Sequence, residues 1–286
     1  MPRYKLTIAY EGTAYCGWQR QYVGEQLGGE GDADRNEGRD QLPTVQQAVE
    51  DAVRKVVREP VHVLGASRTD SGVHAKGQVA AFTCSDGTGM TGGGSGGVEG
   101  DEGAAAGETS APAGERSHGG WPLARGAERL RMAVNSRLPA DVLVRSCEAV
   151  GAAFNPIGDA VRKQYAYRLY SAAERPLWER NLVHHVRAEL DIAKMREAAA
   201  ELVGEHDFAG FAAAGHGRMT TVRRVFRCDV EEGDRGVWGS RDQGSDVVIR
   251  IEGNGFLWNM VRIIAGTLYE AGRGRIDGAR VREALR

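Results

Sequence analysis

Apolar and polar residues recur at regular spacing along most of the chain, and this spacing predicts its helices and strands. Residues 4–10 alternate between the two kinds, as a half-buried strand does. After Pro43, apolar residues recur three or four positions apart, which predicts an amphipathic helix opened by that proline. The residues of this apolar stripe are Val45, Ala48, Val49, Ala52, Val53, Val56 and Val57.

The remaining elements follow from the same periodicities. In the first half the pattern predicts two strands around a polar loop, a helix and a strand, at residues 61–64, 78–84, about 122–137 and 142–150. In the second half Asp191 is the expected N-cap of a helix that runs through Leu202 and ends at Gly204. Its other predicted elements are strands at residues 164–170, 222–230 and 247–252 and a helix from Leu257 to about Ala271.

Both halves thus contain a strand, a helix, further strands and a helix. A chain of 286 residues is long enough for two modest domains. We therefore predict an α+β fold of two related halves, residues 1–150 and 151–286, whose antiparallel sheets join around a central cleft.

Two stretches, residues 22–42 and 85–120, have the composition of disordered insertions. The second contains the run Thr91-Gly-Gly-Gly-Ser-Gly-Gly97. They carry net charges of −4 and −5, so the whole chain is at −2 while the remainder is at +7. A basic remainder permits a phosphate-binding surface, although many proteins that bind no nucleic acid have one too.

The composition excludes several other classes. No stretch approaches the roughly 20 apolar residues that span a bilayer. The start at Met1 leads directly into a strand without a signal peptide, which favours the cytoplasm, or an organelle if a presequence is removed. The four cysteines form no Cys-x-x-Cys pair, and His184-His185 has no third ligand nearby. We expect reduced thiols and neither a metal nor a cofactor.

The densest polar cluster is Ser67-Arg-Thr-Asp-Ser-Gly-Val-His-Ala75, between two predicted strands. An ion pair of Arg68 and Asp70 would keep the carboxylate ionised and oriented, as a nucleophile or base requires. The alternative, which residue types alone favour, is a hydrogen-bonded turn in which Asp70 caps Gly72 and its neighbours. His74 is typical of a packed or hydrogen-bonded histidine, because no Ser or Cys stands at a catalytic spacing.

Six segments, in order, resemble the motifs of the TruA-type tRNA pseudouridine synthase family. The segment from Leu64 to Phe82 contains R-T-D-S-G-V-H-A-K-G-Q-V, against the family's R-T-D-x-G-V-H-A-x-G-Q-V. The other five are Tyr10-Glu-Gly-Thr-Ala-Tyr-Cys-Gly-Trp-Gln-Arg20, Asn135-Ser-Arg-Leu-Pro139, Lys163-Gln-Tyr-Ala-Tyr-Arg-Leu-Tyr170, Leu202-Val-Gly-Glu-His-Asp-Phe208 and Gly253-Asn-Gly-Phe-Leu-Trp-Asn-Met-Val-Arg-Ile-Ile-Ala-Gly266. Apart from the two insertions, the resemblance covers nearly the whole chain.

The resemblance implies roles for four residues. Asp70 corresponds to the catalytic aspartate, and Arg68 to the loop arginine that assists base flipping. Tyr165 corresponds to the tyrosine that packs on the target base, and Arg262 to the basic residue that pairs with the catalytic carboxylate. An aromatic face and a guanidinium replace the stacking that a flipped uracil loses. Whether the carboxylate attacks the sugar or the base stays open.

Structural alternatives accompany two of these assignments. Tyr165 and Tyr167 share one face of a strand, where aromatic residues often only pack, so the resemblance alone selects Tyr165. Without the resemblance, Arg262 would be interpreted as a solvated residue on the polar side of an apolar helix.

The chain departs from the family at three places. The two acidic insertions are unusual. Residues 154–160 replace the family's F-x-A-R-x-x-A, so a backbone-binding arginine is missing or displaced to Arg162. The chain also stops at Arg286, inside a predicted helix and before the family's G-L-x-L-x-x-V strand, which indicates a truncated sequence.

The resemblance further implies that the central cleft binds the anticodon stem–loop of tRNA and that the protein is a homodimer. Two alternatives stay open: the same chemistry on another RNA, and a non-catalytic RNA-binding protein on the same scaffold. The complete set of Arg68, Asp70, Tyr165 and Arg262 argues against the second.

Overall fold

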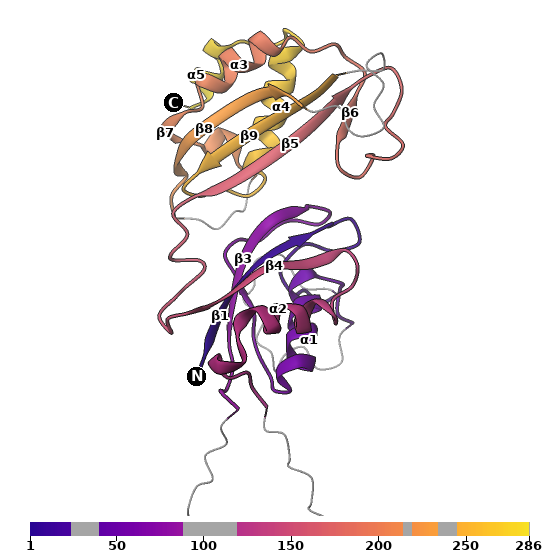
Figure 1. The fold of residues 1–286 in the computed structure, drawn as a ribbon. Coiled ribbons are helices and arrows are strands. Elements are labelled where there is room, and N and C mark those ends of the chain that lie inside the picture. The colour runs from indigo at the N-terminus through magenta and orange to yellow at the C-terminus, as the bar shows by residue number, and fades with distance from the viewer. Residues whose placement is uncertain (24–39, 88–118, 214–218, 234–244, 286) are drawn as a thin grey trace, which may run out of the picture. The chain divides into compact units, whose positions relative to one another are not determined.

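A computed structural model describes residues 1–23, 40–87, 119–213, 219–233 and 245–285. The chain divides into two compact units, Met1–Asp159 and Ala160–Arg286 (Figure 1). Residues 151–159 therefore belong to the first unit. Each unit combines helices with a separate sheet, so the predicted α+β class is confirmed. Most of the two predicted insertions lies outside the described residues.

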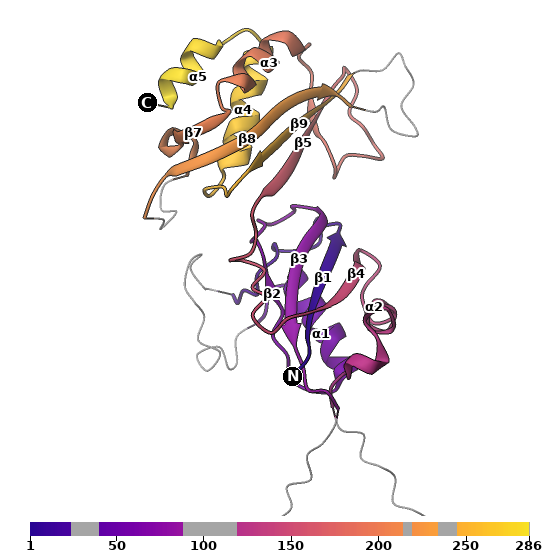
Figure 2. The same cartoon turned by 60° about the vertical axis from the view of Figure 1, so that its left-hand side comes forward.

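Unit 1 has a four-stranded antiparallel sheet in the order β2-β3-β1-β4. Its helices cover one face of that sheet (Figure 2). In chain order its elements are β1 (Arg3–Tyr10), α1 (Val45–Val57), β2 (Leu64–Gly65), β3 (Ala75–Thr83), η2 (Leu123–Arg125), α2 (Ala127–Asn135) and β4 (Val142–Val150).

Alternation and capping explain the first two elements. Every second residue of β1 is buried against the helices, as the alternating pattern predicts. Helix α1 begins after Thr44, whose side chain accepts a hydrogen bond from the Gln47 N–H at 3.4 Å. The helix does not open at Pro43, whose carbonyl instead accepts a hydrogen bond from the Cys16 N–H at 2.8 Å.

Two predicted elements of unit 1 differ from the structure. The strand expected at residues 61–64 is reduced to β2, because side chains of α1 take the backbone hydrogen bonds of Val61 and Val63. The helix expected at residues 122–137 is split into η2 and α2. Gly126 separates them with a φ of 84°, which a right-handed helix cannot include.

Unit 2 has a five-stranded sheet in the order β6-β5-β9-β8-β7. Figure 2 shows its described α-helices on one face, where they form the core with the buried side of the sheet. Its elements are β5 (Lys163–Ser171), β6 (His184–Val186), α3 (Ile192–Ala200), β7 (Gly204–Asp207), η3 (Ala209–Phe211), β8 (Val222–Glu232), β9 (Ser245–Gly253), α4 (Met260–Gly272) and α5 (Gly278–Ala284).

The second sheet is mixed, because β6 pairs with β5 in parallel. Asp191 caps α3 as predicted, accepting a hydrogen bond from the Lys194 N–H at 3.1 Å. Helix α4 begins three residues later than predicted, since Asn259 has a left-handed φ of 57°. We expected the final helix to continue to Arg286. The last described helix, α5, ends at Ala284 instead.

Candidate active site

The predicted polar cluster forms most of the loop between β2 and β3. Backbone hydrogen bonds tie this loop to the segment that follows β1. The Trp18 N–H donates to the Thr69 carbonyl at 3.0 Å, and the Gly72 N–H donates to the Tyr15 carbonyl at 3.2 Å. The hydroxyls of Thr69 and Tyr10 lie 2.9 Å apart in a further hydrogen bond. The backbone on both sides of Asp70 is therefore held in place.

Two glycines make this close approach of segments feasible. A Cβ atom on Gly12 would lie 2.0 Å from the Val73 carbonyl oxygen, far inside van der Waals contact. A Cβ atom on Gly17 would lie 2.4 Å from the Thr69 carbonyl oxygen, and Gly17 also has a φ of +100°. Any other residue at either position would push the loop away.

Asp70 and Arg68 are both exposed. Among the described residues of unit 1, neither side chain has a hydrogen bond or ion-pair partner, so the ion pair considered for them does not form. A solvent-exposed ion pair gains little free energy in water, and no other contact holds the side chains of Arg68 and Asp70 together in the described part of unit 1. A hydrogen-bonded turn does form here. Its hydrogen bond is accepted by the backbone carbonyl of Asp70, from the Val73 N–H at 3.2 Å, and not by the Asp70 side chain. The carboxylate stays available for chemistry.

His74 supports the loop. Its Nδ1 accepts a hydrogen bond from the Gly12 N–H at 3.0 Å and lies 3.3 Å from Glu11 Oε1. A ring nitrogen that accepts this bond carries no proton, so the contact with Glu11 is not an ion pair in that state. The expected hydrogen-bonded histidine is confirmed.

Tyr165 lies in unit 2, on β5 opposite Ile251 of β9. It is half-buried, and its ring meets that of Phe256 edge-on, with centroids 5.2 Å apart and an interplanar angle of 88°. Tyr167, on the same face, lies with its ring centroid 6.3 Å from that of His184. Both tyrosines have structural contacts, so the selection of Tyr165 for the target base stays a prediction.

Arg262 is the third residue of α4 and is exposed. Within the described part of unit 2, its guanidinium has no hydrogen bond or ion pair. The first turn of α4 has no acidic residue, and Asn259 provides no side-chain cap. A cation at the positive end of a helix dipole is unfavourable for the helix. Arg262 therefore does not stabilise the start of α4.

Glu50 on α1, which was not among the residues predicted from the sequence, is a buried charge whose side chain is 0% exposed. Its partners are Arg20 at 3.1 Å, Arg54 at 3.1 Å, His62 at 3.0 Å, the Val63 N–H at 3.0 Å and the Gln46 amide at 3.2 Å. Burial by itself raises the pKa of Glu50, but the hydrogen bonds from His62 and Val63 and the charge of Arg20 outweigh it and lower the pKa. The sequence feature that could have predicted this buried charge is the pair Gln46 and Glu50, which lie four residues apart beside the apolar stripe.

No group of three potential ligands for a metal ion occurs among the described residues. The four cysteines are free thiols. Burial raises the pKa of Cys84 to about 11 and those of Cys147 and Cys228 to about 12, so these thiols stay protonated. None of the described helices is both long and apolar enough to cross a membrane.

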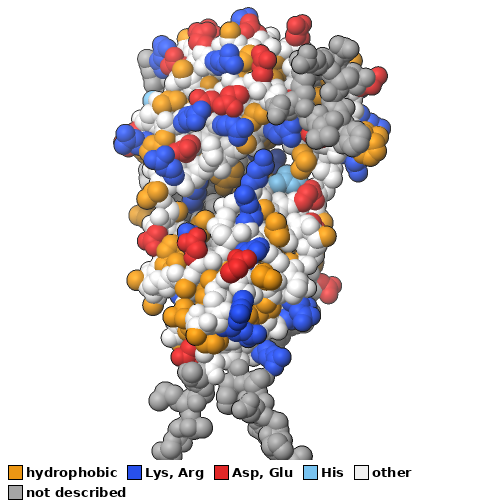
Figure 3. Space-filling view, in the orientation of Figure 1, with side chains coloured by type: hydrophobic (Ala, Val, Ile, Leu, Met, Phe, Trp, Pro, Cys, Tyr) orange, Lys and Arg blue, Asp and Glu red, His pale blue; other side chains and the backbone are white. Residues whose placement is uncertain are grey.

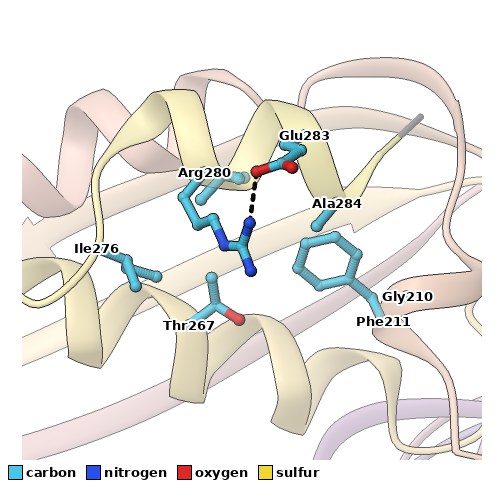
Figure 4. A pocket seen from close by; sticks show the side chains of 8 residues that line it. Gly210, Phe211, Thr267, Ile276, Arg280, Glu283 and Ala284 are labelled. Carbon is cyan, nitrogen blue, oxygen red and sulfur yellow. Dashed lines mark hydrogen bonds and ion pairs between the residues drawn. The ribbon is translucent and has the colours of Figure 1, made fainter.

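The face drawn in Figure 3 shows Lys and Arg side chains beside Asp and Glu side chains in both units. Unit 2 also has an open pocket of about 400 Å³ against α4 and α5 (Figure 4). Arg280 and Glu283 pair at its rim, and Thr267 lines it. None of the four predicted site residues lines this pocket.

Comparison with known proteins defines the class. A family model described as tRNA pseudouridine synthase matches residues 198–286. The tRNA pseudouridine synthase A 2 of Clostridium perfringens is 32% identical over all of this chain and 90% of its own length. The tRNA pseudouridine synthase A of Geotalea uraniireducens is 36% identical over 96% of this chain, and that of Geobacter sulfurreducens 33% over 98%. These relatives are covered over 86% and 88% of their lengths. The chain belongs to the tRNA pseudouridine synthase A family, and the resemblance found in its motifs is confirmed.

Proposed function

We propose that this chain isomerises uridine to pseudouridine in tRNA, with Asp70 as the nucleophile. The observation that supports this best is an exposed carboxylate without a partner in unit 1, on a loop whose backbone is fixed on both sides. The reaction breaks the bond between base and sugar and rejoins them through carbon. It requires a positioned nucleophile and a site that retains the detached base, and no redox step.

The remaining site residues complete the proposal. Arg68 assists extrusion of the target nucleotide, and Tyr165 packs on the extruded base. Arg262 pairs with the reacting carboxylate, which agrees with its unpaired charge at the start of α4. The anticodon stem–loop as target, a homodimer and a cytoplasmic location belong to the same proposal. Sedimentation of the purified protein tests the homodimer.

The variant Asp70→Asn tests the function. An amide keeps the shape but is no nucleophile, so single-turnover formation of pseudouridine should fall at least about 1000-fold while tRNA affinity stays within twofold. Glu148→Gln is a matched control, because Glu148 is an exposed carboxylate of the same unit, paired with Lys5 at 3.4 Å. Turnover by Asp70→Asn close to that of wild type would contradict the assignment. A wild-type protein that binds tRNA without modifying it would support the non-catalytic alternative.

A further inference from the structure

A second aromatic residue is exposed on the sheet of unit 2. Strand β8 pairs with β9 through Val225 and Gly253 and then through Arg227 and Glu252, so Phe226 is the extra residue of a β-bulge. A bulge redirects side chains. As a result Phe226 and Arg227, although consecutive, are both exposed.

Two guanidinium groups flank the Phe226 ring at long range. The Cζ atoms of Arg162 and Arg224 lie 5.4 Å and 5.9 Å from its centroid, and 37% of the residue is exposed. A closely packed cation–π pair in unit 1 looks different: Arg125 lies 3.9 Å from the centroid of Trp121, which is 2% exposed. The Phe226 ring is thus more accessible to solvent than the ring of Trp121, which belongs to the core.

The charge around the ring is not fully balanced. Arg162 pairs with Glu252 at 2.6 Å, and Arg227 pairs with Asp229. Arg224 has no carboxylate partner within the described residues. An open aromatic face beside an uncompensated cation suits a nucleotide, because the base stacks on the ring and the phosphate meets the cation.

The same backbone segment holds this ring and the predicted Tyr165 site. The Arg224 N–H donates to Asn254 Oδ1 at 3.0 Å, and the Asn254 N–H donates back to the Arg224 carbonyl at 3.0 Å. Two residues later, Phe256 packs edge-on against Tyr165. The segment then leads into α4, which carries Arg262. The position of Phe226 is therefore fixed relative to two of the predicted site residues.

We propose that Phe226, Arg162 and Arg224 form a clamp for one unpaired nucleotide of the tRNA substrate, distinct from the uridine that reacts. The base stacks on Phe226, and its phosphate lies against Arg224. This inference rests on the proposed tRNA function and adds a binding site that Asp70, Arg68, Tyr165 and Arg262 do not supply.

Four variants test the clamp with tRNA transcripts as probe. Phe226→Leu should weaken binding about tenfold, because leucine keeps the bulk but not the stacking face, whereas Phe226→Tyr should bind within twofold of wild type. Arg224→Ala should reduce the slope of log affinity against log salt by about one. Arg227→Ala is the matched control on the same bulge and should change the slope much less, because carboxylates already neutralise it.

Two further readouts separate a clamp from a structural role. Phe226→Leu and Arg224→Ala should raise the tRNA concentration that gives the half-maximal single-turnover rate, whereas Arg227→Ala should leave both that concentration and the rate at saturation unchanged. Chemical probing should show one unpaired base protected by wild type and reactive with Phe226→Leu. Unchanged affinity of Phe226→Leu, or equal effects of Arg224→Ala and Arg227→Ala, would overturn the clamp while leaving the proposed function intact. A wild-type protein that forms no pseudouridine would overturn the function itself.

Discussion

The residue before Asp70 shows how the loop backbone is fixed while the side chain of the proposed nucleophile makes no contact of its own in the described part of unit 1. Thr69 is held at its carbonyl by Trp18 and at its hydroxyl by Tyr10. These contacts use backbone and neighbouring side-chain atoms, so the Asp70 carboxylate itself forms no bond within the described part of unit 1. A fixed backbone lowers the entropic cost of bringing nucleophile and substrate together.

The two tyrosines of β5 allow a test at the same scale. Tyr165→Ala should lower the single-turnover rate about tenfold or more, because an alanine cannot stack on an extruded base. Tyr165→Phe keeps the ring and should retain most of the rate. Tyr167→Ala is the control on the same face and should lower the rate less at equal thermal stability. A larger loss for Tyr167→Ala would show that the roles are assigned in the wrong register.

At the scale of elements, helix α1 is tied to its surroundings by a buried charge network as well as by its apolar stripe. Glu50 binds Arg20 of the segment after β1 and the Val63 N–H of the segment before β2. These two segments lead toward the Asp70 loop from either side. Glu50 is buried while its charged partners are partly exposed, so Glu50→Gln mainly weakens hydrogen bonds to a charged group and should lower the free energy of unfolding by about 2 kcal/mol.

The same network predicts how stability varies with pH. The hydrogen bond to Glu50 raises the pKa of His62. A raised folded-state pKa contributes stability that is complete below the unfolded value of about 6.5 and is lost as pH rises through the folded value. For Glu50, whose pKa is lowered, the contribution is lost as pH falls below about 4.5. Between these limits the network is most stabilising.

Urea unfolding of His62→Gln across the pH range checks this expectation. The variant should lose the decline in stability that wild type shows above about pH 6.5 and should keep the decline at acidic pH. Parallel curves for the two proteins above pH 6.5 would contradict it.

At the scale of the whole molecule, the two described ends of the second insertion lie next to each other in unit 1. The Ser85 hydroxyl donates a hydrogen bond to Glu59 at 2.7 Å and lies 2.7 Å from the carbonyl oxygen of Gly119, and the Trp121 N–H donates to the Ser85 carbonyl at 2.9 Å. A Cβ atom on Gly87 would lie 3.9 Å from the Gly119 carbonyl oxygen, so the two ends are adjacent. A short linker is enough to join them.

Replacing residues 88–118 with a short glycine linker should therefore preserve thermal stability, because loop length enters closure entropy only logarithmically. Turnover should also persist, since every predicted site residue lies elsewhere. Affinity for tRNA should rise slightly at low salt, as net negative charge is removed, and the gain should fade as salt increases. Neutralising the acidic residues of this segment at constant length is the control and should give the same gain. Loss of turnover would identify the segment as part of the RNA site.

Local pattern determined much of this protein. The alternation of β1, the apolar stripe of α1 and the cap at Asp191 predict real elements, because each depends on residues close in sequence. The ordered motifs identify the family, since a motif records residue types at fixed spacing, and they make Asp70 the candidate nucleophile. The joining of the two sheets around a cleft, and the disorder of the insertions, stay predictions.

Tertiary structure decided what depends on distant partners. The sequence pattern of residues 61–63 predicts a strand, but side chains of α1 form the hydrogen bonds with their backbone. The spacing of apolar residues within a segment cannot show that distant side chains will bind its backbone. The exposed carboxylate of Asp70 depends on the approach of Gly12 and Gly17 to the loop from more than 50 residues away. The bulge that exposes Phe226 arises from register between β8 and β9. Register is a property of two segments together, so neither segment specifies it alone.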